Sequence, residues 1–167
     1  MTTLYLLRHA KSSWDQPGLA DRERPLAPRG RRAARRMAEH LSAEGARPDV
    51  VLCSTAVRAR ETLEIVLPAL GEAEVLVEEA LYATDADDLL DRIRSLPDGT
   101  SAAMVVGHNP TLQDLALDLA SGGRDLRRLR EKLPTGALVT LAFEGPCREL
   151  GPGRAMLRAL VAPRDLR

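Results

Sequence analysis

The amino-acid sequence predicts an α/β fold, a three-layer α/β/α sandwich with a mostly parallel central sheet. Apolar runs of strand length alternate with helical patterns along the whole chain, which is typical of parallel strands joined by helices. The chain has 167 residues, 44% of them hydrophobic, which suffices for one domain with a substantial core. We therefore expect residues 1–167 to form a single domain.

The first strand and the first helix are predicted from local sequence signals. The run TLYLLR, residues 3–8, predicts a buried strand, and residues 27–45 predict a helix. Pro28 suits the first turn of this helix, and Gly45 follows its end. The other predicted elements are strands at 49–54, 74–78, 102–107, 137–143 and 155–161, and helices at 57–70 and near 86–96 and 110–121.

Several broad classes of protein are excluded by composition. No apolar run approaches the roughly 18 residues that a membrane span needs, and the first residues lack the pattern of a signal peptide. Cys53 and Cys147 lie far apart without a C-x-x-C pair, so they indicate buried thiols rather than a disulfide framework or a zinc site. We expect a cytoplasmic protein with no membrane partner.

The charges are balanced overall but unevenly distributed. Residues 1–60 carry a net charge of +6, residues 61–120 of −11 and residues 121–167 of +5, and 22 of the 24 cations are arginines. Arginine favours planar, bidentate contacts with phosphate or carboxylate. Aromatic residues make up only 2%, and the chain as a whole is not basic, so we expect no nucleic-acid partner.

Side chains that can bind or attack a phosphoryl group follow three of the predicted strands. Arg8 and His9 end the first strand, the segment 54–58 with Arg58 follows the second, and His108 follows the strand at 102–107. In open α/β sheets ligands bind beyond the carboxyl ends of the strands. Two arginines and two histidines meeting there would stabilise a phosphoryl group in transfer, and one histidine could act as the nucleophile.

These positions lie in motifs that resemble the three signatures of the histidine phosphatase superfamily, which has a phosphoglycerate mutase-like fold. The motifs are LLRHAKSSW (6–14), LCSTAVRARETLE (52–64) and VVGHNP (105–110), in that order. LPTGAL (133–138) is similar to a late segment of the superfamily. With DRERPLAPRGRRAA (21–34), the chain most resembles the short SixA-type phosphohistidine phosphatase branch.

The resemblance implies a role for each signature residue. His9 would attack the substrate phosphorus and become phosphorylated, Arg8 and Arg58 would hold the phosphoryl oxygens, and His108 would donate a further hydrogen bond to them. Neither a metal nor another cofactor is implied. Arg58 is expected in the first turn of its helix, after Ser54 or Thr55 as N-cap, with backbone N–H groups facing the anion.

Glu79 is the first candidate for the general acid that protonates the leaving group. Mutase-like members carry a Glu three residues before a Tyr after the third strand, and Glu79 with Tyr82 matches that spacing. Asp15 and Asp21, in the loop after His9, are alternatives. A phosphohistidine leaving group is a nitrogen base that needs less help to leave than an alkoxide, so no strong acid is required for that substrate.

Size and departures from the superfamily pattern bear on the substrate. Many members have Gly and Glu one and two positions after the nucleophile, where this chain has Ala10 and Lys11. Lys11 adds a positive charge that favours an acidic substrate surface or simply faces solvent. Without a large cap insertion we expect access for a phosphohistidine-bearing carrier domain, and thus protein phosphohistidine hydrolysis. Two alternatives stay open: a phosphatase or mutase acting on a small phosphate ester, and an inactive phosphate-binding module.

Overall fold

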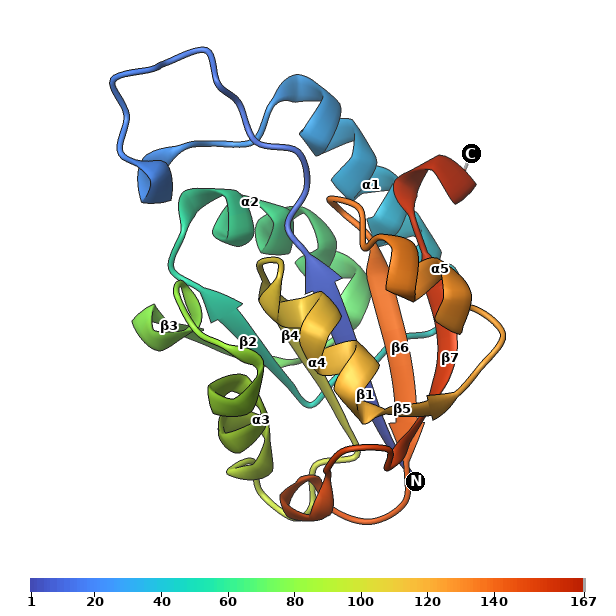
Figure 1. Cartoon of the computed structure of the whole chain (residues 1–167). Helices are drawn as coiled ribbons and strands as arrows, with labels where there is room; N and C mark the ends of the chain where they lie inside the picture. The colour runs from blue at the N-terminus through green and yellow to red at the C-terminus, as the bar shows by residue number, and fades with distance from the viewer. Residues whose placement is uncertain (167) are drawn as a thin grey trace.

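The computed structural model describes residues 1–166, and their strands form one seven-stranded mixed sheet (Figure 1). The strand order across the sheet is β3-β2-β4-β1-β6-β7-β5. The strands are β1 (Thr2–Arg8), β2 (Val50–Ser54), β3 (Glu74–Glu78), β4 (Ala102–Gly107), β5 (Ala120–Gly122), β6 (Leu138–Phe143) and β7 (Ala155–Val161).

The sheet is mostly parallel, as predicted. β3, β2, β4 and β1 run parallel to one another, and β5 runs parallel to β7. β6 is the exception, because it is antiparallel to both β1 and β7. The parallel part therefore brings the carboxyl ends of four strands to one edge, where ligand sites of open α/β sheets form.

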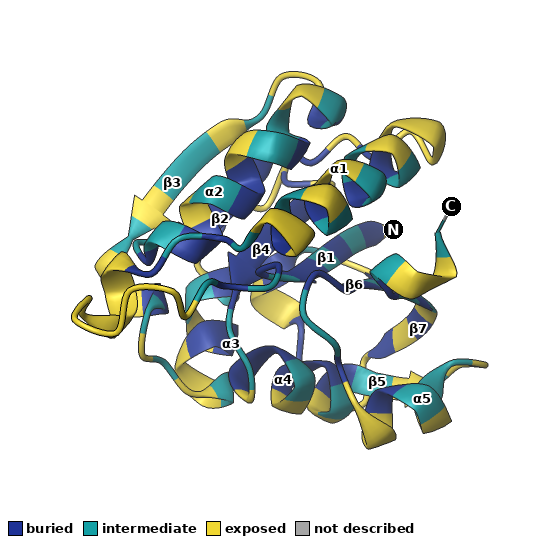
Figure 2. Cartoon of the chain, turned by 90° about the horizontal axis from the view of Figure 1, so that it is seen from above, coloured by how far each residue is buried: buried dark blue, intermediate teal, exposed yellow. Residues whose placement is uncertain are grey.

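Helices cover both faces of this sheet, so the three-layer sandwich is confirmed (Figures 1 and 2). Side chains of a strand alternate between the faces. Leu4 and Leu6 of β1 therefore belong to one apolar cluster, and Leu7 to the other. The first cluster lies against α3 (Ala86–Arg94), α4 (Thr111–Leu119) and α5 (Leu126–Glu131), and the second against α1 (Pro28–Ala43) and α2 (Val57–Val66).

Several element bounds differ from those predicted. The helix expected over 57–70 ends as α2 at Val66 and continues as a 3-10 helix, Leu67–Leu70, because Pro68 cannot donate the backbone hydrogen bond of an α-helix. The helix expected to 121 ends at Leu119, and the next three residues form β5. Neither β5 nor α5 is predicted, because each is too short to show a hydrophobic period. Within residues 1–166 no helix is long and apolar enough to cross a membrane.

The strand register places the signature residues at one level. Arg8 is paired with Gly107 between β1 and β4, and Cys53 with Val106 between β2 and β4. His9 and His108 each follow the first pair by one residue, and Ser54, the last residue of β2, follows Cys53, so the three residues lie near one another at this edge. The connection from β1 to α1, which contains a 3-10 helix at Asp21–Glu23, reaches α2 at this edge.

Candidate active site

His9 is placed directly after β1 with one imidazole nitrogen held and the other free to react. Its Nδ1 lies 2.7 Å from the carbonyl oxygen of Ala10. A carbonyl only accepts, so Nδ1 carries the proton and Nε2 keeps its lone pair. The pKa of His9 is lowered from 6.5 to about 3, mainly by burial and to a lesser extent by the charges of His108, Arg58 and Arg8. The imidazole is therefore neutral at physiological pH, and a neutral imidazole has the lone pair that a nucleophile needs.

Arg58, in the first turn of α2, faces this free nitrogen. Its Nε lies 3.4 Å from Nε2 of His9, and the guanidinium is buried. The two terminal nitrogens donate to the backbone carbonyl of Asp21 at 2.8 Å and to its carboxylate at 3.0 Å. The guanidinium of Arg58 thus holds the Asp21 carboxylate and contacts His9 at the same time. A guanidinium that can bind an anion beside a nucleophile has the geometry that phosphoryl transfer requires.

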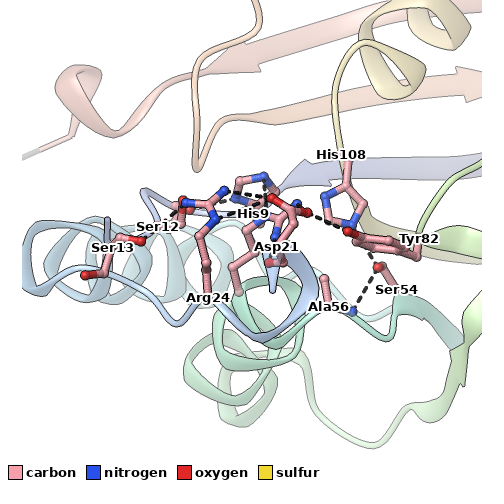
Figure 3. Close-up of polar contacts among 11 residues, drawn as sticks. His9, Ser12, Ser13, Asp21, Arg24, Ser54, Ala56, Tyr82 and His108 are labelled. Atoms are coloured by element: carbon pink, nitrogen blue, oxygen red, sulfur yellow. Dashed lines mark hydrogen bonds and ion pairs between the residues drawn. The ribbon is translucent and has the colours of Figure 1, made fainter. Parts of the chain in front are cut away.

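His108 lies next to His9, with 5.2 Å between the ring centroids (Figure 3). Its Nε2 is 2.8 Å from the Ser54 hydroxyl oxygen, which also accepts the backbone N–H of Ala56. Ser54 can donate its proton to Nε2, which leaves a proton on Nδ1 as a donor. Burial first, and the charge of Arg58 second, lower the pKa of His108 to about 4.

Arg8 is held by residues 133–136, the segment that precedes β6. One terminal nitrogen donates to the carbonyl of Leu133 at 2.8 Å. The N–H of Gly136 donates to the carbonyls of both Arg8 and His9, at 3.1 and 2.9 Å. Gly136 has φ of +75°, which a residue with a side chain adopts only with strain. This segment therefore fixes the backbone that carries the first two signature residues.

Two buried nitrogens of this cluster have no hydrogen-bond partner. Among the described residues they are Nε of Arg8 and Nδ1 of His108. Buried polar groups are nearly always paired, and an unpaired one costs about 1–3 kcal/mol. Both nitrogens can donate a hydrogen bond, and the oxygens of a phosphoryl group are acceptors of the kind that they lack.

Asp21 connects the loop after β1 to the cluster (Figure 3). Its carboxylate accepts from the Tyr82 hydroxyl at 2.5 Å, from Arg58 and from Arg24. The Tyr82 hydrogen bond, followed by Arg58, lowers the pKa of Asp21 from 3.8 to about 2. The guanidinium of Arg24 is largely buried and also donates to Ser12 at 2.7 Å. Asp21 is thus an anion already bound to Arg58.

Arg24 and Ser54 are the site residues whose roles the sequence did not reveal. A buried arginine before Pro25 is the signal that could have identified Arg24, but burial is not visible in the sequence. The guanidinium of Arg24 also lies 3.6 Å from the ring centroid of Trp14, which is 69% exposed. Trp14 therefore lies on the rim of the site and not in the core.

The other two candidates for general acid, Glu79 and Asp15, make no hydrogen bond to Arg58 among residues 1–166. The carboxylate of Glu79 is bound by Arg22 and by the Thr55 hydroxyl, the latter at 2.6 Å, and it is exposed. These contacts lower its pKa, with Thr55 the larger cause. Asp15 is exposed, and its backbone N–H donates to Ser13. Of the three acidic residues, Asp21 is the one in contact with Arg58.

The predicted N-cap of the second helix is wrong. Ala56 occupies the N-cap position of α2 and makes no side-chain hydrogen bond there. Ser54 instead holds His108, and the Thr55 hydroxyl donates to Glu79. The two hydroxyls lie before the N-cap position, and each makes a hydrogen bond to a residue distant in the sequence instead of capping the helix.

The fold and the cluster of two histidines and two arginines at its edge fit a phosphoryl-transfer protein. The sequence profile of the histidine phosphatase superfamily (branch 1) matches residues 4–92. The chain belongs to the histidine phosphatase superfamily, as its motifs indicated, and is thereby a phosphatase of the hydrolase class.

Several proteins are similar to nearly the whole chain. An uncharacterized protein of Mycobacterium tuberculosis is 39% identical over 163 residues, covering 95% of this chain and all of the relative. A structure from Nakamurella multipartitia, assigned to the SixA phosphohistidine phosphatases, is 30% identical with a TM-score of 0.86, covering 97% of this chain and 96% of that one. Another from Agrobacterium tumefaciens, assigned likewise, is 31% identical with a TM-score of 0.83 and covers 97% and 98%.

Proposed function

We propose that this phosphatase hydrolyses phosphohistidine on proteins through a covalent phosphohistidine intermediate on His9. The observation that carries the proposal is the unprotonated Nε2 of His9, which faces Arg58 and lies between two cationic side chains and His108. Such an arrangement presents a nucleophile and phosphate-binding donors to the same phosphorus atom.

In the first step Nε2 of His9 attacks the phosphorus, and the bond between phosphorus and the substrate nitrogen breaks. The electron pair of that bond stays on the substrate imidazole, which takes up a proton. Arg58 and Arg8 hold the equatorial oxygens while charge spreads over them, and Nδ1 of His108 donates to one oxygen. We propose no metal in this step, since these side chains supply the positive charge.

In the second step water attacks the phosphorus on His9. The bond between Nε2 and phosphorus breaks, inorganic phosphate leaves, and the neutral imidazole is restored. The hydrogen bond from Nδ1 to Ala10 keeps the ring in one orientation through both steps. Any group that removes a proton from this water must lie near the phosphoryl oxygens.

Asp21 is our candidate for the group that donates and later removes these protons, ahead of Glu79 and Asp15. Its carboxylate already contacts Arg58, whereas Glu79 is bound to Arg22 and Thr55. A phosphoryl dianion would draw Arg58 away from Asp21 and add negative charge beside it. Both changes raise the pKa of Asp21 from about 2, as an acid catalyst needs.

The protein substrate is supported by similarity and by architecture. Two structures at 30% and 31% identity are assigned as phosphohistidine phosphatases. The chain aligns with them over nearly its whole length, so we propose one domain without a cap insertion. The two cysteines are buried and unpaired, which suits a reducing compartment, and we propose a cytoplasmic location.

The test compares a chemically phosphorylated histidine-bearing carrier domain with small phosphate esters such as 3-phosphoglycerate. We expect the carrier domain to have the higher kcat/KM. Radiolabelled phosphoryl groups should be trapped on the wild-type protein by an alkaline quench and not on a His9→Ala variant. Faster turnover of the esters would overturn the substrate, and stoichiometric binding without covalent labelling would indicate a phosphate-binding module.

A further inference from the structure

A basic groove lies beside the proposed active site. It has a volume of about 330 Å³ and is lined by cations from four segments of the chain. Lys11 comes from the loop after β1, Arg29 and Arg36 from α1, Lys132 from the end of α5 and Arg164 from the C-terminal 3-10 helix. Figure 1 shows α1 and the C-terminal segment next to one another at the upper edge of the sheet.

These five cations have no anionic partner among residues 1–166. No carboxylate lines the basic groove, and none of the five takes part in an ion pair of the described chain. Asp165, next in the chain to Arg164, is held by Arg128 at 2.9 Å. The basic groove therefore presents concentrated positive charge that an external anion can neutralise.

The basic groove is joined to the nucleophile through covalent and hydrogen-bonded links. Lys11 follows His9 by two residues. On the opposite wall, Thr135 precedes Gly136, whose N–H donates to the carbonyls of Arg8 and His9. A molecule whose phosphoryl group reaches His9 can thus extend a neighbouring part over the basic groove.

The wall chemistry favours a polypeptide over a compact anion. Between the cations the lining is apolar, with Ala33, Pro134, Ala162 and Pro163. Arg29, Lys132 and Arg164 are exposed, and their side chains are long. A small phosphate compound is bound best by buried, fixed donors, whereas an acidic segment with apolar side chains matches an apolar floor with a cationic rim.

We propose that the basic groove docks an acidic segment of the protein that delivers the phosphoryl group to His9. This inference rests on the proposed function, because it assigns the groove to the same substrate. The groove then selects the phosphoprotein by charge, while the site at His9 performs the chemistry on any phosphohistidine that is presented to it.

The test uses labelled synthetic peptides and two charge-reversal variants. One peptide is rich in glutamate with interspersed leucine and a central histidine, and its analogue has glutamine in place of glutamate. The variant Arg29→Glu/Arg36→Glu reverses two cations of the basic groove. The matched control, Arg32→Glu/Arg35→Glu, makes the same change in net charge at exposed positions of α1 outside the groove.

Binding of the unphosphorylated peptides, measured by fluorescence anisotropy at low salt, tests the groove without catalysis. We expect the wild-type protein to bind the glutamate peptide roughly tenfold more tightly than the glutamine peptide. The groove variant should lose this preference and the control variant should keep it. Equal binding of both peptides, or equal loss in the two variants, would overturn the inference, as would tripolyphosphate binding to the groove in place of the peptide.

Hydrolysis of the same peptides after chemical phosphorylation of the histidine separates the two proposals. We expect the groove variant to raise KM for the glutamate peptide alone, with kcat unchanged. If the wild-type protein hydrolyses both phosphopeptides with the same KM, the proposed function stands and the docking inference fails. If it hydrolyses neither, the proposed function fails, and the anisotropy result still decides whether the groove binds acidic peptides.

Discussion

Replacing Asp21 by Asn is the most informative single change, because it removes a carboxylate that occupies the phosphate-binding guanidinium of Arg58. The pKa of Asp21 falls from 3.8 to about 2 in the folded protein. At about 1.4 kcal/mol for each pKa unit, this shift corresponds to about 2.5 kcal/mol. Tyr82 causes the largest part of this shift and Arg58 a smaller part, and half of the side chain is exposed, so we assign about 1 kcal/mol to the interaction with Arg58.

This free energy predicts that inorganic phosphate binds more tightly to the Asp21→Asn variant. The phosphate no longer competes with an internal anion, so we expect its competitive inhibition constant to fall about fivefold. Inhibition of p-nitrophenyl phosphate hydrolysis at neutral pH measures this constant. The same variant loses the proposed acid, so kcat for an alkyl phosphate ester should fall by about 100-fold. The loss for p-nitrophenyl phosphate should be smaller, because its leaving group needs no proton.

Glu79→Gln is the matched control, since it makes the same chemical change at a carboxylate held by Arg22 and Thr55. We expect less than a twofold change in the inhibition constant of phosphate or in kcat.

The pH dependence of stability gives a second check on Asp21. Its contribution to the free energy of unfolding is present above pH 4 and lost as the pH falls towards 2, because its pKa is lowered by folding. A loss of kcat in Glu79→Gln with none in Asp21→Asn would refute this reasoning and restore Glu79 as the acid.

Two further predictions concern the histidines. Ser54→Ala removes the hydroxyl that lies 2.8 Å from Nε2 of His108, so we expect about 1–2 kcal/mol less stability in urea denaturation and about tenfold lower kcat/KM; a Ser13→Ala control should change neither. The pKa values of His9 and His108, about 3 and about 4, lie below the usual 6.5, so the unfolded chain binds more protons between these values. Stability should be complete above pH 6.5 and fall by up to about 2 kcal/mol per histidine at pH 5. A His9→Asn/His108→Asn variant with the same loss over this range would contradict the assignment.

Long elements of the fold were predictable because burial imposes a period on the sequence. The strands β1, β2 and β4 are apolar on both faces, since helices cover both, and their continuous apolar runs identify them. The three residues of β5 and the six of α5, four of which are charged, leave no such period. The antiparallel direction of β6 could not be predicted from the sequence either, because an apolar run has the same pattern in a parallel and an antiparallel strand.

The candidate site was predictable where its residues follow a strand directly. Arg8, His9 and His108 are carried to one level by the register of neighbouring strands, which leaves little freedom in their placement. The loop after β1 has no such constraint. The sequence offered Asp15 and Asp21 on equal terms, and only the contacts with Arg58 and Tyr82 distinguish them.

By itself, the sequence determined the α/β architecture, the order of its principal elements and the residues that cluster at the carboxyl edge of the sheet. These properties follow from local hydrophobic period and from strand ends, which neighbours in the chain specify. The tertiary structure alone decided which nitrogen of His9 is free, which carboxylate contacts Arg58, and that five cations from four segments form one groove. Such properties depend on side chains distant in the sequence, whose contacts exist only after the layers have packed.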